Sequence, residues 1–309
     1  MYDRKARNAE IFTDTEYMYQ TNKTLKESVE NSIKGQKIIF ANDEIEITSE
    51  DEVKIDESIN DSINCSINDS INENIDKNKK MCKVVVSGKR TLEASESYAK
   101  QGKKVCILNF ASATNPGGGV VHGASAQEEA ICRCSTLFPC LGTTKLWNDF
   151  YMAHRMANNP LYNNDCIFTP SVKVFKSDID FPELLAESEW WDVDVITCAA
   201  PNLRRVPSNL MNPNAGSKPA EISFEDLKEL LRDRIERIFR LAIQNKAEVL
   251  ILGAFGCGAF RNPPELVAEV FAEYTKKYQK YFEVIEYAVY HRPNEMGNYN
   301  AFKKIFWRE

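Results

Sequence analysis

The stretch Val105–Glu129, VCILNFASATNPGGGVVHGASAQEE, decides the fold around it. It opens with the apolar run Val105–Phe110, whose short length and partly β-branched composition predict a buried strand. Regular structure then stops at the Asn-Pro-Gly-Gly-Gly sequence that ends in Gly117–Gly119. Beyond this turn, Ala124–Cys134 favours a helix. The stretch therefore predicts a strand, a bare glycine loop and a helix in direct succession.

The glycine loop has the properties of an anion site. Three consecutive glycines, Gly117–Gly119, remove every Cβ at one place, so that backbone N–H groups can approach a ligand closely. The N-terminus of the following helix adds further N–H groups. Two carboxylates, Glu128 and Glu129, stand near the start of that helix and should repel an anion. Such a conflict with the local electrostatics indicates a reaction centre.

The composition is that of a globular protein with ordinary core-forming content. The chain has 309 residues, of which 43% are hydrophobic, enough for one large α/β domain with an appendage or two small domains. It contains no apolar run of membrane-spanning length, and its first residues lack the apolar segment of a signal peptide. Nine irregularly spaced cysteines indicate free thiols and a cytoplasmic location. Cys132-x-Cys134 has no second pair at ligand spacing, so we expect no metal site.

The negative charge is concentrated in one low-complexity segment. Residues 41–80 hold twelve acidic residues and four lysines, a net of −8, so the net charge of −6 leaves +2 for the rest. The triplet Ser-Ile-Asn recurs there at Ser58, Ser62, Ser66 and Ser70. We interpret residues 41–81 as an acidic insertion that is disordered, with a weak amphipathic helix as the alternative. The near-neutral remainder has no basic stripe for duplex nucleic acid.

The segments on either side of this insertion differ in pattern. Residues 1–40 predict a helical arm that packs on the main domain. Over 82–309, strands alternate with helices, as in a three-layer α/β/α domain. The strands are expected at Lys83–Ser87, Val105–Phe110, Ile167–Pro170, Val172–Phe175, Val193–Ala199, Val249–Leu252 and Phe282–Tyr290. The helices are expected at Thr91–Gln101, Ala124–Cys134, from the N-cap Ser223 to about Leu241, from Pro264 to about Tyr281, and at Asn298–Trp307.

A second glycine loop follows another predicted strand. Of the thirteen glycines, seven lie in two clusters, Gly117–Gly123 and Gly253–Gly258. Each cluster comes after a strand and before a helix, which places both at the carboxyl edge of the sheet, where α/β proteins bind ligands. Two such loops can hold a ligand that carries two phosphates.

These motifs together resemble the microbial-type poly(ADP-ribose) glycohydrolases, a branch of the macrodomain superfamily. The resemblance rests on Gly117-Gly118-Gly119, seven further residues, and then Gln127-Glu128-Glu129. It extends to the upstream NFASATN, to ITCAAPNLR and to GAFGCGAFRNPP, and covers about 2–40 and 82–309. It implies a macrodomain-like mixed sheet with an N-terminal helical extension. The implied activity is exo-type hydrolysis of the ribose–ribose O-glycosidic bonds of poly(ADP-ribose) on modified proteins.

The resemblance also implies roles for individual residues. Glu129 corresponds to the general acid, and Glu128 to the residue that holds ribose hydroxyls. Since adjacent helical residues diverge by about 100°, the two carboxylates cannot act on one atom in the same way. The implied substrate-binding residues are Asn115, Gly117, Gly118, Gly119, Gln127, Gly256, Cys257, Gly258, Ala259 and Phe260. Asn115 and Phe260 would contact the distal ribose and the glycines the diphosphate, with no cofactor.

Two other functions remain compatible with the same residues. One is a macrodomain that binds ADP-ribose without cleaving it, which Glu129 disfavours. The other is a hydrolase that removes single ADP-ribose groups from protein or nucleic acid. This second alternative would use the same loops and similar glutamate chemistry, so sequence does not separate it from a polymer hydrolase.

Overall fold

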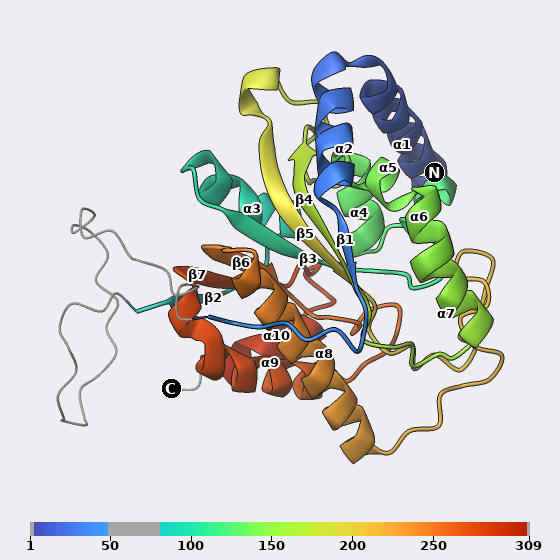
Figure 1. Cartoon of the computed structure of the whole chain (residues 1–309), viewed down its shortest axis with the longest axis vertical. Helices are drawn as coiled ribbons and strands as arrows, with labels where there is room; N and C mark the ends of the chain where they lie inside the picture. The colour runs from blue at the N-terminus through green and yellow to red at the C-terminus, as the bar shows by residue number, and fades with distance from the viewer. Residues whose placement is uncertain (1–2, 49–80, 308–309) are drawn as a thin grey trace.

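The computed structural model describes residues 3–48 and 81–307. In this part of the chain, seven strands form one mixed sheet in the order β1-β4-β5-β3-β6-β7-β2 (Figure 1). The strands are β1 Lys37–Ile39, β2 Lys83–Ser87, β3 Val105–Phe110, β4 Cys166–Val174, β5 Trp191–Cys198, β6 Val249–Leu252 and β7 Val284–Ala288. From β5 to β2 all neighbours run parallel, whereas β4 is antiparallel to both β1 and β5.

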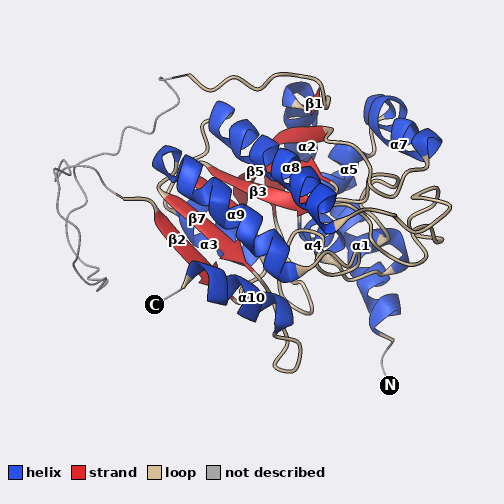
Figure 2. Cartoon of the chain, turned by 90° about the horizontal axis from the view of Figure 1, so that it is seen from below, coloured by secondary structure: helices blue, strands red, loops and turns tan. Residues whose placement is uncertain are grey.

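Helices cover both faces of the sheet. The α-helices are α1 Arg4–Thr21, α2 Lys23–Gly35, α3 Thr91–Lys100, α4 Gln127–Cys134, α5 Leu137–Leu141, α6 Thr144–Leu146, α7 Met152–Ala157, α8 Phe224–Gln244, α9 Pro264–Tyr278 and α10 Gly297–Phe306. One face is covered by α8, α9 and α10, and the other by α1, α3, α4 and α5 (Figure 2). The protein is thus the predicted three-layer α/β/α domain.

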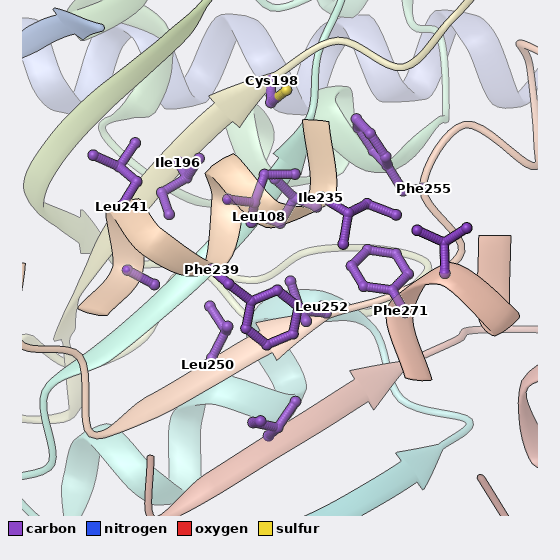
Figure 3. Close-up of a cluster of buried hydrophobic side chains, with 14 of the residues drawn as sticks. Leu108, Ile196, Cys198, Ile235, Phe239, Leu241, Leu250, Leu252, Phe255 and Phe271 are labelled. Atoms are coloured by element: carbon purple, nitrogen blue, oxygen red, sulfur yellow. The ribbon is translucent and has the colours of Figure 1, made fainter. Parts of the chain in front are cut away.

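The side chains of the central strands alternate between two cores. In β3, Cys106 and Leu108 pack under α8 and α9, while Val105 and Ile107 face the opposite layer. Successive residues of a strand point to opposite faces, so a strand covered on both sides is apolar throughout. Figure 3 shows the first core, in which Phe239 of α8 and Phe271 of α9 lie over Leu250 and Leu252 of β6. None of the helices in the described ranges is long and apolar enough to span a bilayer.

Most of the predicted strands and helices are confirmed, with three corrections. Residues 1–40 are not wholly helical, because Lys37–Ile39 forms β1 and pairs with β4. Helix α4 begins at Gln127 rather than at Ala124, so Glu128 and Glu129 stand in its first turn. The two strand pieces expected around Pro170 form one strand, β4, with an irregularity between Thr169 and Val172. Ser223 caps α8 as predicted, accepting from the N–H of Asp226.

Helix α1 packs directly against the glycine loop. The Asn8 side chain donates to the carbonyl of Gly123 at 3.1 Å, and Thr15 donates to the carbonyl of Arg133 at the end of α4 at 2.6 Å. Gly123 has a φ of +72°, and a Cβ there would overlap the backbone carbonyl of Lys5. The N-terminal helix therefore touches both ends of the segment that carries the two glutamates.

We expect Gly123→Ala to destabilise the protein more than Gly102→Ala does. Both glycines have positive φ, but a Cβ at Gly102 meets nothing within 4 Å. Both variants thus bear the left-handed cost of about 1–2 kcal/mol. Gly123→Ala adds an overlap with α1 worth about 1–3 kcal/mol. Urea unfolding of the two variants measures the difference, and equal losses would contradict the close packing of α1 on the loop.

The start of the predicted insertion lies on α8. The Ile45 side chain is buried, and Arg240 donates to its carbonyl at 2.6 Å and 2.9 Å. Arg237 binds the carbonyl of Asp43 at 2.9 Å. The rest of the insertion, residues 49–80, and the disorder predicted for it lie outside the described residues. The division of the chain into an arm (1–40), an insertion (41–81) and a catalytic domain (82–309) stays a prediction.

Candidate active site

A cavity of about 480 Å³ opens at the carboxyl edge of the parallel strands. Both glycine loops reach it: Gly118 and Gly119 after β3, and Gly256 and Gly258 after β6. The first turn of α4 contributes Gln127, Glu128 and Glu129 to the same wall, and Ala259 and Phe260 follow the second loop. Since β3 and β6 are neighbours in the sheet, their loops meet, as the sequence indicated.

The first glycine loop takes a conformation that side chains would disrupt. Gly117 and Gly118 have φ of +65° and +59°. A Cβ at Gly118 would lie 2.5 Å from Glu129 Oε1 and 3.2 Å from Glu128 Oε2. The loop backbone is therefore pressed against both carboxylates, which only glycine permits.

Glu129 is held by one oxygen, and its other oxygen is without a partner. Its Oε1 accepts from the N–H of Gly119 at 2.9 Å. Its Oε2 is buried and has no hydrogen-bond partner among the described residues. A buried polar atom without a partner is costly, and such atoms in native proteins are found at strained or catalytic positions.

Glu128 is held at both oxygens. The backbone N–H of Ser112 donates to Oε2 at 2.8 Å, and the Asn109 side-chain amide donates to Oε1 at 3.3 Å. Burial, reinforced by the neighbouring charge of Glu129, raises the pKa of Glu128 well above its ordinary value, although these hydrogen bonds act in the opposite direction. Two buried carboxylates side by side cannot both ionise readily. Glu128 thus retains its proton more tightly than an isolated glutamate does.

We expect Glu128→Gln to stabilise the folded protein at neutral pH. A raised folded-state pKa means that the native state binds the proton more tightly than the unfolded chain does. Stability is therefore lost as the pH rises from the unfolded pKa through the folded one. Glutamine is neutral, keeps an acceptor for Ser112 and can donate to Asn109 Oδ1, which has no partner among the described residues.

The stability difference should grow with pH. Near pH 4 the variant and the parent should unfold alike, and at pH 8 the free energy of unfolding of the variant should exceed that of the parent. Urea titrations across this range measure it. A difference independent of pH would contradict the raised pKa of Glu128.

In the second glycine loop, a Cβ would have no room at Gly256 but would have open space at Gly258. Gly256 has a φ of +72°, and a Cβ there would lie 2.5 Å from Asn262 Nδ2. A Cβ at Gly258 would meet nothing within 4 Å, although this residue lines the cavity. Packing therefore does not explain glycine at 258. Phe260 contacts Tyr162, with 6.0 Å between ring centroids.

Three of the predicted binding residues do not line the cavity. Asn115 turns its amide to the carbonyl of Gly118 within its own loop, and Gly117 faces Phe138. Cys257 packs partly buried against the core under α8 and α9. Gln127 lines the cavity, but its amide is already used by the protein: it accepts from Phe110 N–H and donates to the Leu108 carbonyl.

The sequence did not single out several residues that line the cavity or hold its glutamates. Asn109 and Ser112 hold Glu128, and Asn109 could have been found as the one polar residue in the apolar run of β3. Asp178 also lines the cavity; burial raises its pKa to about 6, although it accepts from Leu92 N–H. The loop between β5 and α8 contributes Arg204, Asn209, Met211 and Asn212. Its position depends on long-range packing that leaves no local signal.

The cavity also has walls outside the glycine loops and the start of α4. It is lined by Thr91, at the start of α3, and by Val289 and Tyr290 after β7. The Arg90 guanidinium lies 3.9 Å from the Tyr290 ring centroid. In the described ranges, no three His, Cys, Asp or Glu side chains gather into a group that could hold a metal ion.

The chain was compared with known families and structures. The family model of the microbial-type PARG catalytic domain matches residues 6–177. The poly(ADP-ribose) glycohydrolase (PARG) of Thermomonospora curvata is 26% identical, with 97% of this chain and 99% of that chain covered and a TM-score of 0.74. The same enzyme bound to the inhibitor ADP-HPD is 25% identical, covering 96% and 98%, with a TM-score of 0.71.

A further structure contains a bound nucleotide. The PARG of Deinococcus radiodurans in complex with ADP-ribose is 26% identical, with 90% of this chain and 96% of that chain covered and a TM-score of 0.67. A search among curated protein sequences found no significant match. A family model over more than half of the chain agrees with structures that match nearly all of it, and the chain therefore belongs to the microbial-type poly(ADP-ribose) glycohydrolases.

Proposed function

We propose that this glycohydrolase cleaves the terminal ribose–ribose O-glycosidic bond of poly(ADP-ribose) and releases ADP-ribose, with Glu129 as general acid. The observation that carries the assignment is the buried Oε2 of Glu129, which has no partner in the described part of the chain and belongs to a cavity wall between two glycine loops. Glu128 has both oxygens engaged and is suited to hold hydroxyl groups rather than to transfer a proton.

The chemistry follows from the bond to be broken. Cleavage at the anomeric carbon develops positive charge on the ribose ring and needs a proton on the departing oxygen. In the reactive state Glu129 is the protonated carboxyl and supplies that proton from Oε2, while Gly119 N–H holds Oε1. The ionised carboxylate left behind then takes a proton from the attacking water. Glu128 accepts hydrogen bonds from ribose hydroxyls beside the bond.

The cavity accommodates the rest of ADP-ribose along the sheet edge. The diphosphate lies between the backbones of Gly118–Gly119 and Gly256–Gly258, whose N–H groups replace cationic side chains. Phe260 packs against the distal ribose. Asn115, Gly117 and Cys257 shape the loops rather than touch the ligand. The adenine extends towards Val289 and Tyr290, an apolar and aromatic wall suited to a base.

The substrate is polymer carried by modified proteins, in the cytoplasm, and the reaction uses no cofactor. Nine irregularly spaced cysteines suit a reducing compartment. Outside residues 41–80 the sequence is close to neutral, with a net charge of +2, so we do not expect duplex nucleic acid as a ligand.

The product distribution tests the proposal. Poly(ADP-ribose) on an auto-modified polymerase is incubated with the enzyme, and free ADP-ribose and oligomer lengths are followed over time. We expect ADP-ribose from the first time point and gradual shortening of the polymer. Early appearance of mid-length oligomers would contradict end-wise cleavage. Release only from singly modified protein would assign the chain to the mono-ADP-ribosyl hydrolases, and binding without release to the ADP-ribose readers.

A further inference from the structure

The loop between β5 and α8, residues 199–223, is fastened to the catalytic segment through one buried side chain. Asn212 Oδ1 accepts from the hydroxyls of Ser112 and Thr114, at 2.8 Å and 2.6 Å. Its Nδ2 donates to the Tyr162 hydroxyl at 3.2 Å. Asn212 is 6% exposed, and its three side-chain bonds join parts of the chain distant in sequence.

Through Ser112, the hydrogen bonds of Asn212 are connected to Glu128. The same residue, Ser112, donates its backbone N–H to Glu128 Oε2 at 2.8 Å. The Ser112 hydroxyl also accepts from Asn115 N–H at 3.1 Å, which folds the segment into a tight turn. Asn212 thus holds the hydroxyl of Ser112, and the backbone N–H of the same Ser112 holds the carboxylate of Glu128.

The neighbouring residue, Met211, is connected to Glu129 through Gly119. Met211 reaches Gly119 so closely that a Cβ on that glycine would lie 2.7 Å from its sulfur. Gly119 N–H is the donor that holds Glu129 Oε1. The turn that presents both residues is closed by reciprocal Asn209–Asn212 backbone bonds, each 3.1 Å. The turn at residues 209–212 therefore contacts both Ser112 and Gly119, whose N–H groups donate to Glu128 and Glu129.

We propose that Asn212 is a positioning residue for the glycohydrolase reaction, holding the 112–115 segment so that Glu128 stays aligned while Met211 covers Gly119. This inference rests on the proposed function, since the reaction is the one assigned to Glu128 and Glu129. Asn212 touches neither carboxylate and acts through Ser112. The Arg155 side chain, which donates to the Thr114 carbonyl at 2.6 Å, holds the same segment at its backbone.

The test replaces Asn212 with leucine, which keeps the side-chain size but has no acceptor. We expect kcat on poly(ADP-ribose) to fall about tenfold to a hundredfold, as for a small misplacement of a catalytic group. The Kd for ADP-ribose by calorimetry should change less than threefold, because the glycine loops remain. Asn212→Asp keeps an acceptor for both hydroxyls and should recover kcat to within a few-fold of the parent.

The matched control lies two residues along the same loop. Asn214 is exposed and has a φ of +54°, a conformation suited to glycine and tolerated by aspartate. Asn214→Gly and Asn214→Asp should therefore leave kcat and Kd unchanged. Thermal unfolding of every variant shows whether it is folded at the assay temperature.

A double-mutant cycle separates positioning from general stabilisation. If Asn212 acts through the Ser112 hydroxyl, Ser112→Ala reduces kcat similarly, and the double variant with Asn212→Leu loses no more than the worse single variant. Multiplicative losses would overturn the inference, as would a folded Asn212→Leu enzyme with parental kcat. If the parent enzyme itself releases no ADP-ribose, the proposed function fails instead, so the two failures are distinguishable.

Discussion

Glu129→Gln is expected to lower the rate of ADP-ribose release about a thousandfold, within the range that general acids contribute. Glutamine keeps an acceptor for Gly119 N–H and has nearly the same size, so the loop and the fold should be retained. What it lacks is the transferable proton at the position of Oε2, the oxygen without a partner among the described residues. Steady-state release from polymer gives the rate, and calorimetry gives the Kd for ADP-ribose.

The comparison with Glu128→Gln shows which carboxylate transfers the proton. Glu128 is bonded at both oxygens, so its replacement should weaken binding of the ribose and reduce kcat less than Glu129→Gln does. A thousandfold loss in Glu128→Gln with a milder effect in Glu129→Gln would reverse the assignment of the two roles.

Gly118→Ala is expected to reduce activity about a hundredfold, the scale of a displaced catalytic group. The new methyl would lie 2.5 Å from Glu129 Oε1 and 3.2 Å from Glu128 Oε2, so both carboxylates must move. The φ of +59° adds a conformational cost of about 1–2 kcal/mol. Activity should thus be lost well beyond what the loss of stability explains.

Gly102→Ala is the matched control for this variant. It has a φ of +79° and open space around the new methyl, and it lies in the turn after α3. In urea titrations Gly118→Ala should lose more stability than Gly102→Ala, because only its methyl meets other atoms, and Gly102→Ala should keep parental kcat. Parental kcat in Gly118→Ala would contradict the contact between the glycine loop and the two carboxylates.

Much of the sheet could be predicted because its strands are buried on both faces. A strand such as Val105–Phe110 must then be apolar throughout, which is a strong local signal. β1 was missed because it has only three residues, Lys37–Ile39, and pairs at the sheet edge with a partner far along the chain. Local propensity carries no information on such pairing.

The residues of the site likewise fall into those that the sequence could predict and those that it could not. Glu128, Glu129 and the glycines that approach them follow from one continuous stretch, so their proximity could be expected from sequence. The direction of each side chain could not: Asn115 turns back onto its own loop, and Cys257 turns into the core. Asn212 reaches Ser112 across a hundred residues of chain, a contact that depends on the assembled fold.

The central claim concerns where the scissile bond lies, and a crystal structure with ADP-ribose tests it most directly. The account predicts that the anomeric hydroxyl of the distal ribose lies within hydrogen-bonding distance of Glu129 Oε2, with the diphosphate on the backbones of Gly118–Gly119 and Gly256–Gly258. A ligand bound in the opposite direction, with adenine against the glutamates and the distal ribose at Tyr290, would contradict it.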